Sequence, residues 1–412
     1  MTDGSMTAAT HEGKDVNRGR VAFVPPRYGT EIVGGSEAVM REAAHGLARR
    51  GWEVEVLTTC ARDHYTWRNE YPPGVSTHDD GVVVHRFLVE GAKPRRSRAR
   101  IEARIQSGAT VPLADQLAWL DGLFRVPGLF RHLVVNSDRY DAVILSPYLF
   151  WTTVTGATIV PERTIVMPCL HDEPYARLEI LNPVLSDVAR LWFLSEPEHE
   201  LAHECASLPE HVVTGAGVHV PTSYDAEGFC ERHGITRPFI LFAGRRERGK
   251  GWDWLLAAFH FAIRQYGLEF DLVTIGVSPA DTPADLSGRV HDVGFLEEAE
   301  VANAFAAATA YVQPSTNESF SRTIMESWLA GTPVLAAAGS EVLRWHCDRS
   351  GGGLTFADEF ELAQCLSFLA NAPDDAARLA KAGREYVLAN YQWDVVLDAM
   401  ETSLEELRCA SS

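Results

Sequence analysis

The chain has 412 residues, enough for two or three domains of ordinary size. With 46% apolar and 23% charged residues, its composition is that of a globular protein with large buried cores. Its net charge of −19 argues against a general nucleic-acid-binding role, because neutralising phosphates requires a positive surface.

The cysteines and the N-terminal residues indicate a cytoplasmic protein. None of the seven cysteines forms a CxxC pair, which is typical of reduced thiols. No stretch approaches the ~20 consecutive apolar residues of a membrane-spanning helix. Residues 1–18 lack the apolar core of a secretory signal, so we expect a disordered tail there.

Strand and helix patterns alternate from residue 19 to residue 217, the expected limits of a first domain. Its expected elements are a strand Val21–Val24, a helix Ser36–Arg50 that Gly51 ends, and strands Val54–Leu57, Ala142–Leu145, Arg163–Met167 and Leu191–Leu194. Strands separated by helices indicate right-handed βαβ units and a mostly parallel sheet.

Residues 93–131 depart from this alternation. A basic run precedes an apolar helical pattern; the cations are Lys93, Arg95, Arg96, Arg98, Arg100 and Arg104, and the apolar side chains include Trp119, Leu120, Leu123, Phe124 and Phe130. Either the segment is a helix–loop insertion that shapes a ligand pocket, or it seats the protein peripherally on anionic lipid at the inner face of the membrane. We favour the insertion.

A second block of the same kind follows a weak stretch at residues 210–237. Its expected elements are strands Phe239–Phe242, Phe270–Ile275, Val290–Val293, Tyr311–Val312 and Pro333–Ala336, helices Trp252–Tyr266, Glu297–Ala308 and Thr323–Ala330, and helical segments from about Asp358. We therefore expect two doubly wound, parallel-sheet α/β domains, 19–217 and 218–390, and a C-terminal helix, 391–412. Ligands bind at the carboxyl ends of such strands, so the cleft between the domains is the expected site.

The loop after Phe242 carries the first candidate residues. Gly244 opens it, and Arg245 and Lys250 can both face an anion at the carboxyl end of the strand. Gly244 to Lys250 also satisfies the GxxxxGK start of a P-loop. Gly251 follows, however, where a P-loop has the Ser or Thr that binds Mg²⁺, so that interpretation is disfavoured.

Two glutamates eight residues apart form the second candidate group. Glu318 lies in the loop before an expected helix, and Glu326 lies inside that helix. Both carboxylates can accept hydrogen bonds from sugar hydroxyls, and the free N–H groups of residues 321–323 can hold a phosphate. Taken alone, the pair is better explained as a helix cap and a surface ion pair.

Together, these motifs resemble those of retaining GT-B glycosyltransferases of family 4, the glycosyl transferases group 1. The resemblance covers about residues 20–405 and rests on the Gly-Arg-x4-Lys loop, the Glu-x7-Glu pair, Ala330-Gly-Thr-Pro-Val334, Gly34-Gly35 at the first helix, His171-Asp172 after a strand, and Tyr391-Gln-Trp-Asp394. Each motif alone is weak, whereas the combination is specific.

The resemblance implies transfer of a sugar from a nucleotide-diphosphate donor to an acceptor hydroxyl, with retained anomeric configuration. The acceptor stays open among a glycan, a lipid-linked glycan and a small metabolite. The implied catalytic residues are His171, Arg245, Lys250 and Glu318. The implied donor-binding residues are Gly34, Gly35, Gly244, Arg245, Lys250, Phe295, Glu318, Ser319, Phe320, Ser321, Arg322, Thr323 and Glu326. Glu326 would hold the ribose, and backbone near residues 293–296 would read the base.

Two stretches differ from the family pattern. Many members have Glu-Gly-Phe-Gly where this chain has Glu318-Ser-Phe-Ser321, and serine has less backbone freedom than glycine. Many also have Asn-Gly-Val-Asp where this chain has Ala216-Gly-Val-His219, so His219 is assigned no role.

No Asp-x-Asp occurs in the chain, so the carboxylate clamp for Mg²⁺ or Mn²⁺ found in the other main glycosyltransferase fold is missing. We therefore expect no obligatory metal and no other cofactor.

Two alternatives stay open. One is a GT-B relative that binds sugar nucleotides without transferring the sugar. The other, disfavoured, is a zinc hydrolase built on His199-Glu200-Leu-Ala-His203, a literal HExxH. It needs a third ligand, for which neither Glu204 nor His211 has an evident geometry.

Overall fold

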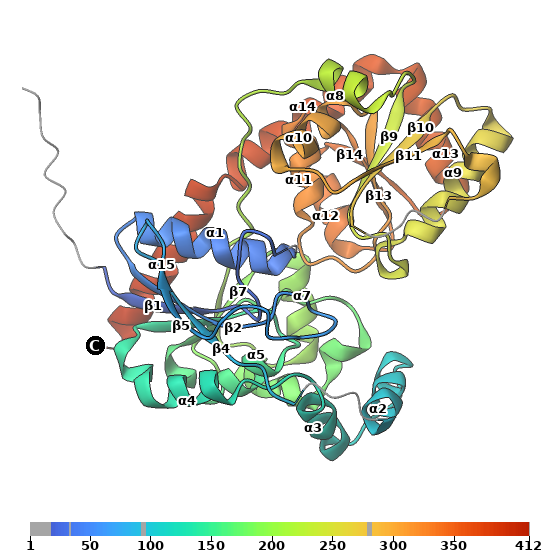
Figure 1. The fold of residues 1–412 in the computed structure, drawn as a ribbon. Helices are drawn as coiled ribbons and strands as arrows, with labels where there is room; N and C mark the ends of the chain where they lie inside the picture. Colours follow the sequence, from blue (N-terminus) through green and yellow to red (C-terminus); the bar gives the residue numbers. More distant parts are fainter. Residues whose placement is uncertain (1–17, 33, 92–95, 278–281, 412) are drawn as a thin grey trace, which may run out of the picture.

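The computed structural model describes residues 18–32, 34–91, 96–277 and 282–411. The residues expected to form the tail therefore lie, except for Arg18, outside the described part of the chain. The chain forms two α/β domains, each built on its own sheet, which lie next to each other (Figure 1). The expected fold class is confirmed.

The first sheet has eight strands in the order β3-β4-β2-β1-β5-β6-β7-β8. All its strand pairs are parallel except β3 with β4. The strands are β1 (Arg20–Val24), β2 (Glu53–Thr59), β3 (Gly74–Thr77), β4 (Val83–Phe87), β5 (Ala142–Leu145), β6 (Thr164–Val166), β7 (Arg190–Phe193) and β8 (Glu210–Val213). Val21–Val24 are fully buried, as expected of a central parallel strand with helices on both faces.

Its helices are α1 (Gly35–Arg49), α2 (Arg96–Gln106), α3 (Leu113–Asp121), α4 (Pro127–Asn136), α5 (Trp151–Gly156), α6 (Asn182–Ser186) and α7 (Glu196–Cys205). Gly51, in the left-handed region at φ 93°, follows α1 as predicted. Short 3-10 turns lie at Ser137–Arg139, Pro161–Arg163, Pro174–Arg177 and Glu179–Leu181.

The second sheet has six parallel strands in the order β11-β10-β9-β12-β13-β14. They are β9 (Phe239–Ala243), β10 (Asp271–Ile275), β11 (Val290–Gly294), β12 (Ala310–Gln313), β13 (Val334–Ala337) and β14 (Gly353–Phe356). Its helices are α8 (Ala226–His233), α9 (Trp252–Tyr266), α10 (Glu298–Ala307), α11 (Arg322–Leu329), α12 (Glu341–Ser350), α13 (Glu359–Asn371) and α14 (Pro373–Asn390), with 3-10 turns at Arg248–Lys250 and Ala284–Leu286.

The last helix, α15 (Trp393–Ser411), returns to the first domain and lies beside α1 (Figure 1). Glu401 on α15 accepts hydrogen bonds from Arg18, Arg50 and the indole of Trp52. The chain passes between the domains twice, near Val218 and near Tyr391. These two connecting segments lie side by side, and Val218 N donates a hydrogen bond to Tyr391 O at 2.9 Å. The domain limits 19–217, 218–390 and 391–412 stay a prediction.

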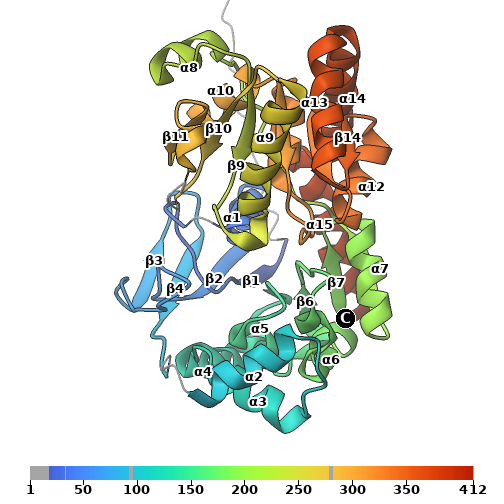
Figure 2. The ribbon, with the colours of Figure 1, turned by 90° about the vertical axis from the view of Figure 1, so that its right-hand side faces the viewer.

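The insertion interpretation of residues 93–131 fits the structure better than the lipid interpretation. Trp119, Leu120 and Phe124 are buried in the core of the first domain, so these side chains are not available to a bilayer. Figure 2 shows α2 and α3 at the end of this domain, outside α4 and α5. The side chains of Lys93, Arg95 and Arg96 lie outside the described residues. Among the described helices, none combines the length and apolar character needed to cross a bilayer.

Several elements were missed or misplaced. The stretch 210–237, expected to be irregular, contains β8 and α8, and β3, β4, α12 and β14 were not anticipated. These elements carry many polar residues: every residue of β3 is exposed, and β8 is half-buried at best. Edge strands of this kind lack the apolar runs on which strand prediction depends.

Candidate active site

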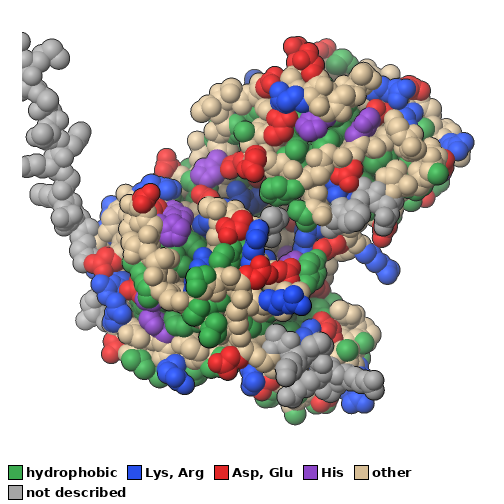
Figure 3. Space-filling view, in the orientation of Figure 1, with side chains coloured by type: hydrophobic (Ala, Val, Ile, Leu, Met, Phe, Trp, Pro, Cys, Tyr) green, Lys and Arg blue, Asp and Glu red, His purple; other side chains and the backbone are tan. Residues whose placement is uncertain are grey.

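The candidate residues lie where the carboxyl ends of the two sheets face each other. The space-filling view shows a notch between the two domains with acidic and basic side chains along it (Figure 3). From the second domain, the loops after β9 and β12 supply the charged groups. From the first domain come the loops after β1, β2 and β6.

An ion pair forms the centre of the site. Lys250 Nζ donates to Glu318 Oε1 at 2.7 Å, and the Glu318 side chain is only 10% exposed. Gly251 makes this approach possible, since it has φ 75° and a Cβ there would lie 2.7 Å from the carbonyl oxygen of Pro314. The same contact explains why the Ser or Thr of a P-loop does not fit at this position.

His171 reaches the same place from the first domain. Burial lowers the pKa of the His171 imidazole. The carboxylates of Glu318 and Glu173 raise this pKa in part, and the positive charge of Lys250 lowers it further. The ring is therefore neutral at pH 7. His171 is thus within electrostatic reach of Lys250 and Glu318, which come from the other domain, and its Nδ1 lies 3.9 Å from Glu173 Oε1.

Arg245 touches the first domain rather than Glu318. Its Nη1 lies 3.3 Å from His64 Nε2 and 3.4 Å from Glu247 Oε1. Glu247 in turn accepts a hydrogen bond from the hydroxyl of Tyr65. Burial lowers the pKa of His64; the charges of Arg27 and Arg245 add to this effect, and the carboxylates of Asp63 and Glu37 oppose it.

Gly34 and Gly35 begin α1 and have different surroundings. Gly35 is exposed, and a Cβ on it would meet nothing within 4 Å. A Cβ on Gly34 would lie 2.3 Å from Glu37 Oε2. Glu37 is buried and pairs with the buried Arg27, whose Nε donates to Glu37 Oε1 at 3.0 Å.

The segment before α11 has an unusual backbone. Ser321, the residue preceding the helix, has φ 69°, the left-handed region that favours glycine. Its Oγ accepts a hydrogen bond from Gln313 Nε2 at 3.0 Å. Thr323 Oγ1 accepts one from Tyr311 OH at 2.9 Å. The polar side chains of β12 therefore hold the start of the helix.

Ser319 and Phe320 tie the loop before α11 to neighbouring parts of the protein. The carbonyl oxygen of Ser319 accepts a hydrogen bond from Ser195 Oγ at 2.9 Å, which joins this loop to the first domain. Phe320 is 3% exposed and packs edge-on against Tyr391, so only its backbone can face a donor.

The remaining candidates lie around this segment. Glu326 is on α11, where burial raises the pKa of its carboxyl and Arg322 opposes the rise. In the described part of the chain, the Glu326 carboxylate has no hydrogen-bond or ion-pair partner. Phe295 follows β11 and is 59% exposed, and Gly244 follows β9.

Glu198, in the first turn of α7, is a residue next to His171's loop that the sequence motifs did not single out. Ser195 Oγ accepts from Glu198 N at 3.3 Å and so caps the start of α7. The Glu198 carboxyl accepts the N–H groups of Leu170 and Leu194 at 2.6 Å each. Burial raises its pKa to about 8. It therefore fixes the loop that presents His171.

Comparisons with known proteins agree with this geometry. The model for "Glycosyl transferases group 1" matches residues 237–372. A D-inositol 3-phosphate glycosyltransferase of Thermobispora bispora is 30% identical over 407 residues, which cover 89% of this chain and 88% of the relative. The chain belongs to the glycosyl transferases group 1. Another D-inositol 3-phosphate glycosyltransferase, of Saccharomonospora viridis, is 26% identical over 90% of this chain and 89% of its own.

Solved members of the GT-B fold match the chain over nearly its full length. Sucrose-phosphate synthase of Thermosynechococcus elongatus superposes with a TM-score of 0.73 at 19% identity, covering 96% of this chain and 100% of the other. HepE of Anabaena, solved with UDP and glucose, gives 0.67 at 15% identity over 94% and 100%. The expected family, the GT-B fold and glycosyltransferase activity are thereby confirmed.

Membership of the glycosyl transferases group 1 leaves no support for the zinc hydrolase. His199 and His211 stack with ring centroids 4.4 Å apart, but His203 and Glu200 are exposed. Among the described residues, the HExxH group gathers no three ligand atoms at metal-binding distances. The histidines lie on the outer side of α7, where the motif is a chance match.

Proposed function

We propose that this glycosyltransferase moves a sugar from a nucleotide-diphosphate donor to an acceptor hydroxyl, with retention and without an obligatory metal. The observation that carries the proposal is the Lys250–Glu318 ion pair, which faces His171 across the cleft. Related folds solved with UDP, with UDP-glucose or with UDP-2-fluoro glucose support a nucleotide-sugar donor.

The leaving diphosphate develops negative charge, which fixed cations stabilise strongly. Lys250 and Arg245 supply that charge from the loop after β9. The free N–H groups at the start of α11 add a partial positive charge. The open backbone at Gly35 lets the diphosphate approach the start of α1.

The two glutamates bind hydroxyl groups. Glu318, already oriented by Lys250, accepts from the hydroxyls of the donor sugar. Glu326, whose carboxylate has no partner in the described part of the chain, accepts from the ribose diol. Burial strengthens both hydrogen bonds because little water competes for them.

Retention follows from a same-face reaction. The acceptor oxygen bonds to the anomeric carbon as the bond to the diphosphate oxygen breaks, and the acceptor proton passes to that departing oxygen. Neutral His171 donates a hydrogen bond to the sugar during this step. No protein carboxylate has to act as a nucleophile, and a divalent cation is not needed beside Arg245 and Lys250.

For the acceptor we propose a small polyol. A pocket of about 390 Å³ lies next to His171, between the loop after β6 and the α2–α3 connection. Asp172, Glu173 and Glu179 line it, and its one arginine, Arg177, is held by Asp172 at 2.8 Å. Carboxylates bind hydroxyls well and repel phosphates. Inositol is therefore expected to be a better acceptor than D-inositol 3-phosphate.

The first experiment is calorimetric titration of the full chain with UDP-, GDP-, ADP- and dTDP-glucose, in EDTA and then with Mn²⁺. Binding of one nucleotide class in EDTA, followed by sugar transfer to inositol with retained configuration, supports the proposal. Binding without transfer to any acceptor indicates a non-catalytic relative. Loss of transfer in EDTA with recovery in Mn²⁺ refutes metal independence.

Lys250→Ala is expected to lower kcat at least about 100-fold, the usual cost of removing one transition-state donor. Arg248→Ala is the matched control, because this exposed cation lies two residues away and makes no ion pair in the described part of the chain. Glu326→Ala is expected to weaken nucleotide binding. Wild-type turnover in Lys250→Ala and Glu326→Ala alike would show that the site is elsewhere.

A further inference from the structure

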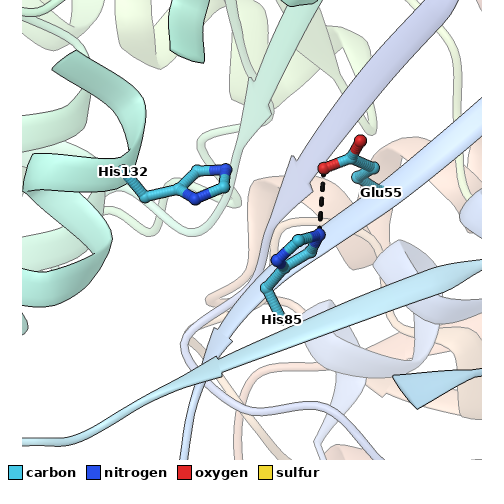
Figure 4. A group of neighbouring side chains, drawn as sticks. All are labelled: Glu55, His85 and His132. Atoms are coloured by element: carbon cyan, nitrogen blue, oxygen red, sulfur yellow. Dashed lines mark ion pairs between the residues drawn. The ribbon is translucent and has the colours of Figure 1, made fainter. Parts of the chain in front are cut away.

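Three side chains of the first domain converge at a place that the transfer reaction does not use. Glu55 comes from β2, His85 from β4 and His132 from α4 (Figure 4). Glu55 is near the amino end of β2, whereas the cleft residues follow the carboxyl end of that strand. At ~3.3 Å per residue, about 13 Å of strand separates Glu55 from Thr59.

The three residues offer three ligand atoms that lie close to one another. One nitrogen of each imidazole and one carboxylate oxygen all lie within 4.8 Å of one another. His85 Nε2 lies 3.0 Å from Glu55 Oε2. This nitrogen is buried and, despite that short distance, forms no hydrogen bond of good geometry. A buried nitrogen without a hydrogen bond is costly unless something else binds it.

A second set of contacts holds the carboxylate in place. Tyr140 OH donates to Glu55 Oε2 at 2.7 Å, and Arg139 Nη2 donates to Glu55 Oε1 at 3.1 Å. Tyr140 OH also lies 3.0 Å from His132 Nε2. Outer partners of this kind orient ligands in metal sites. Arg139 is 46% exposed, so its guanidinium can turn to solvent when a cation enters.

We propose that Glu55, His85 and His132 bind a divalent transition-metal ion of the zinc class. Two imidazoles and one carboxylate are a ligand set of zinc sites that keep water in the remaining position. Tetrahedral zinc at 2.0–2.1 Å separates its ligand atoms by roughly 3.3 Å. Binding therefore requires a small closure of the three side chains.

The proposed ion has a structural role. It joins α4 to β2 and β4, at the part of the sheet where β4 pairs with the exposed strand β3. Because the site is distant from the cleft, it does not supply the reacting groups. The proposal does not depend on the sugar-transfer mechanism, and EDTA is expected to lower the Tm of the metal-loaded chain without abolishing transfer.

The test uses the full chain, stripped with EDTA and titrated with ZnCl₂ while Tm is recorded. Binding to the folded state raises Tm by mass action, so Tm is expected to rise with the first equivalent of zinc and then to climb slowly with the logarithm of free Zn²⁺. CoCl₂ is a second probe, since cobalt bound by these ligands acquires visible absorption. His85→Gln and His132→Gln are expected to abolish both signals, and far-UV circular dichroism without metal checks that the variants fold.

His199→Gln and His203→Gln are the matched controls, because they remove histidines of the HExxH segment on another helix. Both are expected to keep the zinc-dependent rise and the cobalt absorption. No rise in the wild-type protein would overturn the proposal. So would a rise that persists in His85→Gln and His132→Gln, or one that disappears in the controls.

Discussion

Ser321 shows how a single residue departs from what its backbone favours. A non-glycine residue in the left-handed region costs about 1–2 kcal/mol, and the chain keeps one immediately before α11. The Ser321 hydroxyl offsets part of this cost, since it accepts the Gln313 amide N–H at 3.0 Å. The serine is thus a compromise between backbone strain and a buried hydrogen bond.

Ser321→Gly and Ser321→Ala separate the two effects. Glycine removes the strain and the hydrogen bond together, so we expect a free energy of unfolding close to that of the wild type. Alanine keeps the strain and loses the bond, which is expected to cost about 1–3 kcal/mol. Chemical denaturation of both variants measures the difference. An alanine variant as stable as the glycine variant would show that the backbone is relaxed at this position.

His346 predicts a pH dependence of stability. Its ring lies beneath Phe320, fully buried, with Nδ1 3.0 Å from Tyr386 OH, and burial lowers its pKa to about 3. Above the ordinary histidine pKa of about 6.5, the ring is neutral in both the folded and the unfolded chain. Below it, only the unfolded chain takes up the proton. Stability is therefore lost as pH falls from 6.5 towards 3.

The contribution is about 1.4 kcal/mol per pH unit, or about 2 kcal/mol between pH 6.5 and pH 5. His346→Gln cannot be protonated, so its free energy of unfolding is expected to fall less steeply over this interval. Urea denaturation at pH 7, 6 and 5 tests this for both proteins. Parallel curves would mean that His346 is protonated in the folded state.

At the scale of elements, the first turn of α7 also holds the loop that carries His171. Glu198 in its first turn holds the N–H of Leu170, the residue before His171. Glu198→Ala would leave two buried N–H groups without acceptors, each costing about 1–3 kcal/mol, and would release the loop. We expect a lower Tm together with a lower kcat.

Glu198→Gln keeps one acceptor oxygen in the same place, so it is expected to recover part of both losses. Donor Kd, measured by calorimetry, is expected to stay near the wild-type value in both variants. A purely structural role for Glu198 would lower Tm and leave kcat of the folded enzyme unchanged.

Strong local patterns made most of the elements predictable. The helix Trp252–Tyr266 was predicted with its observed bounds because its apolar stripe is long and glycines flank both ends. The loops carrying Lys250 and Glu318 were found because glycines and charged residues interrupt apolar runs. Arg246 was overlooked between two candidates, although its side chain is buried and pairs with Asp292.

Contacts between residues far apart in the sequence could not be predicted from local patterns. Neither the Arg27–Glu37 pair nor the grouping of Glu55, His85 and His132 has a fixed sequence spacing. Each depends on which strands become neighbours, and strand order is a property of the whole sheet. The HExxH segment shows the opposite case: it has the residue spacing of a zinc site, but its side chains do not form one among the described residues.

At the scale of the molecule, three kinds of contact set the domains against each other. Loops meet in the cleft through Ser195 and Ser319, and through Arg245 and His64. The two crossings pair at Val218 and Tyr391. α15 also packs on the first domain and buries apolar side chains from the end of the chain that follows the second domain, while α12 of the second domain lies against α7 of the first. Packing of α15 therefore helps to fix the cleft.

This packing is closest where α15 crosses α1. A Cβ on Gly46 would lie 2.6 Å from Leu397 Cδ1, so the two helices meet at a glycine. Gly46→Ala is expected to cost about 1–3 kcal/mol through overpacking, despite the better helix propensity of alanine. Leu397→Ala is expected to cost about 2–5 kcal/mol by opening a cavity.

The double variant distinguishes this close contact from general destabilisation. The methyl group that Gly46→Ala adds occupies part of the space that Leu397→Ala leaves, so the two costs are expected to sum to more than the cost of the double variant, by about 0.5–3 kcal/mol. Strict additivity would show that the helices do not meet at Gly46. Because α15 follows the second domain and its packing on α1 helps to fix the cleft, Gly46→Ala is also expected to raise KM for the donor. Adding Leu397→Ala to the same chain is expected to reverse part of that rise.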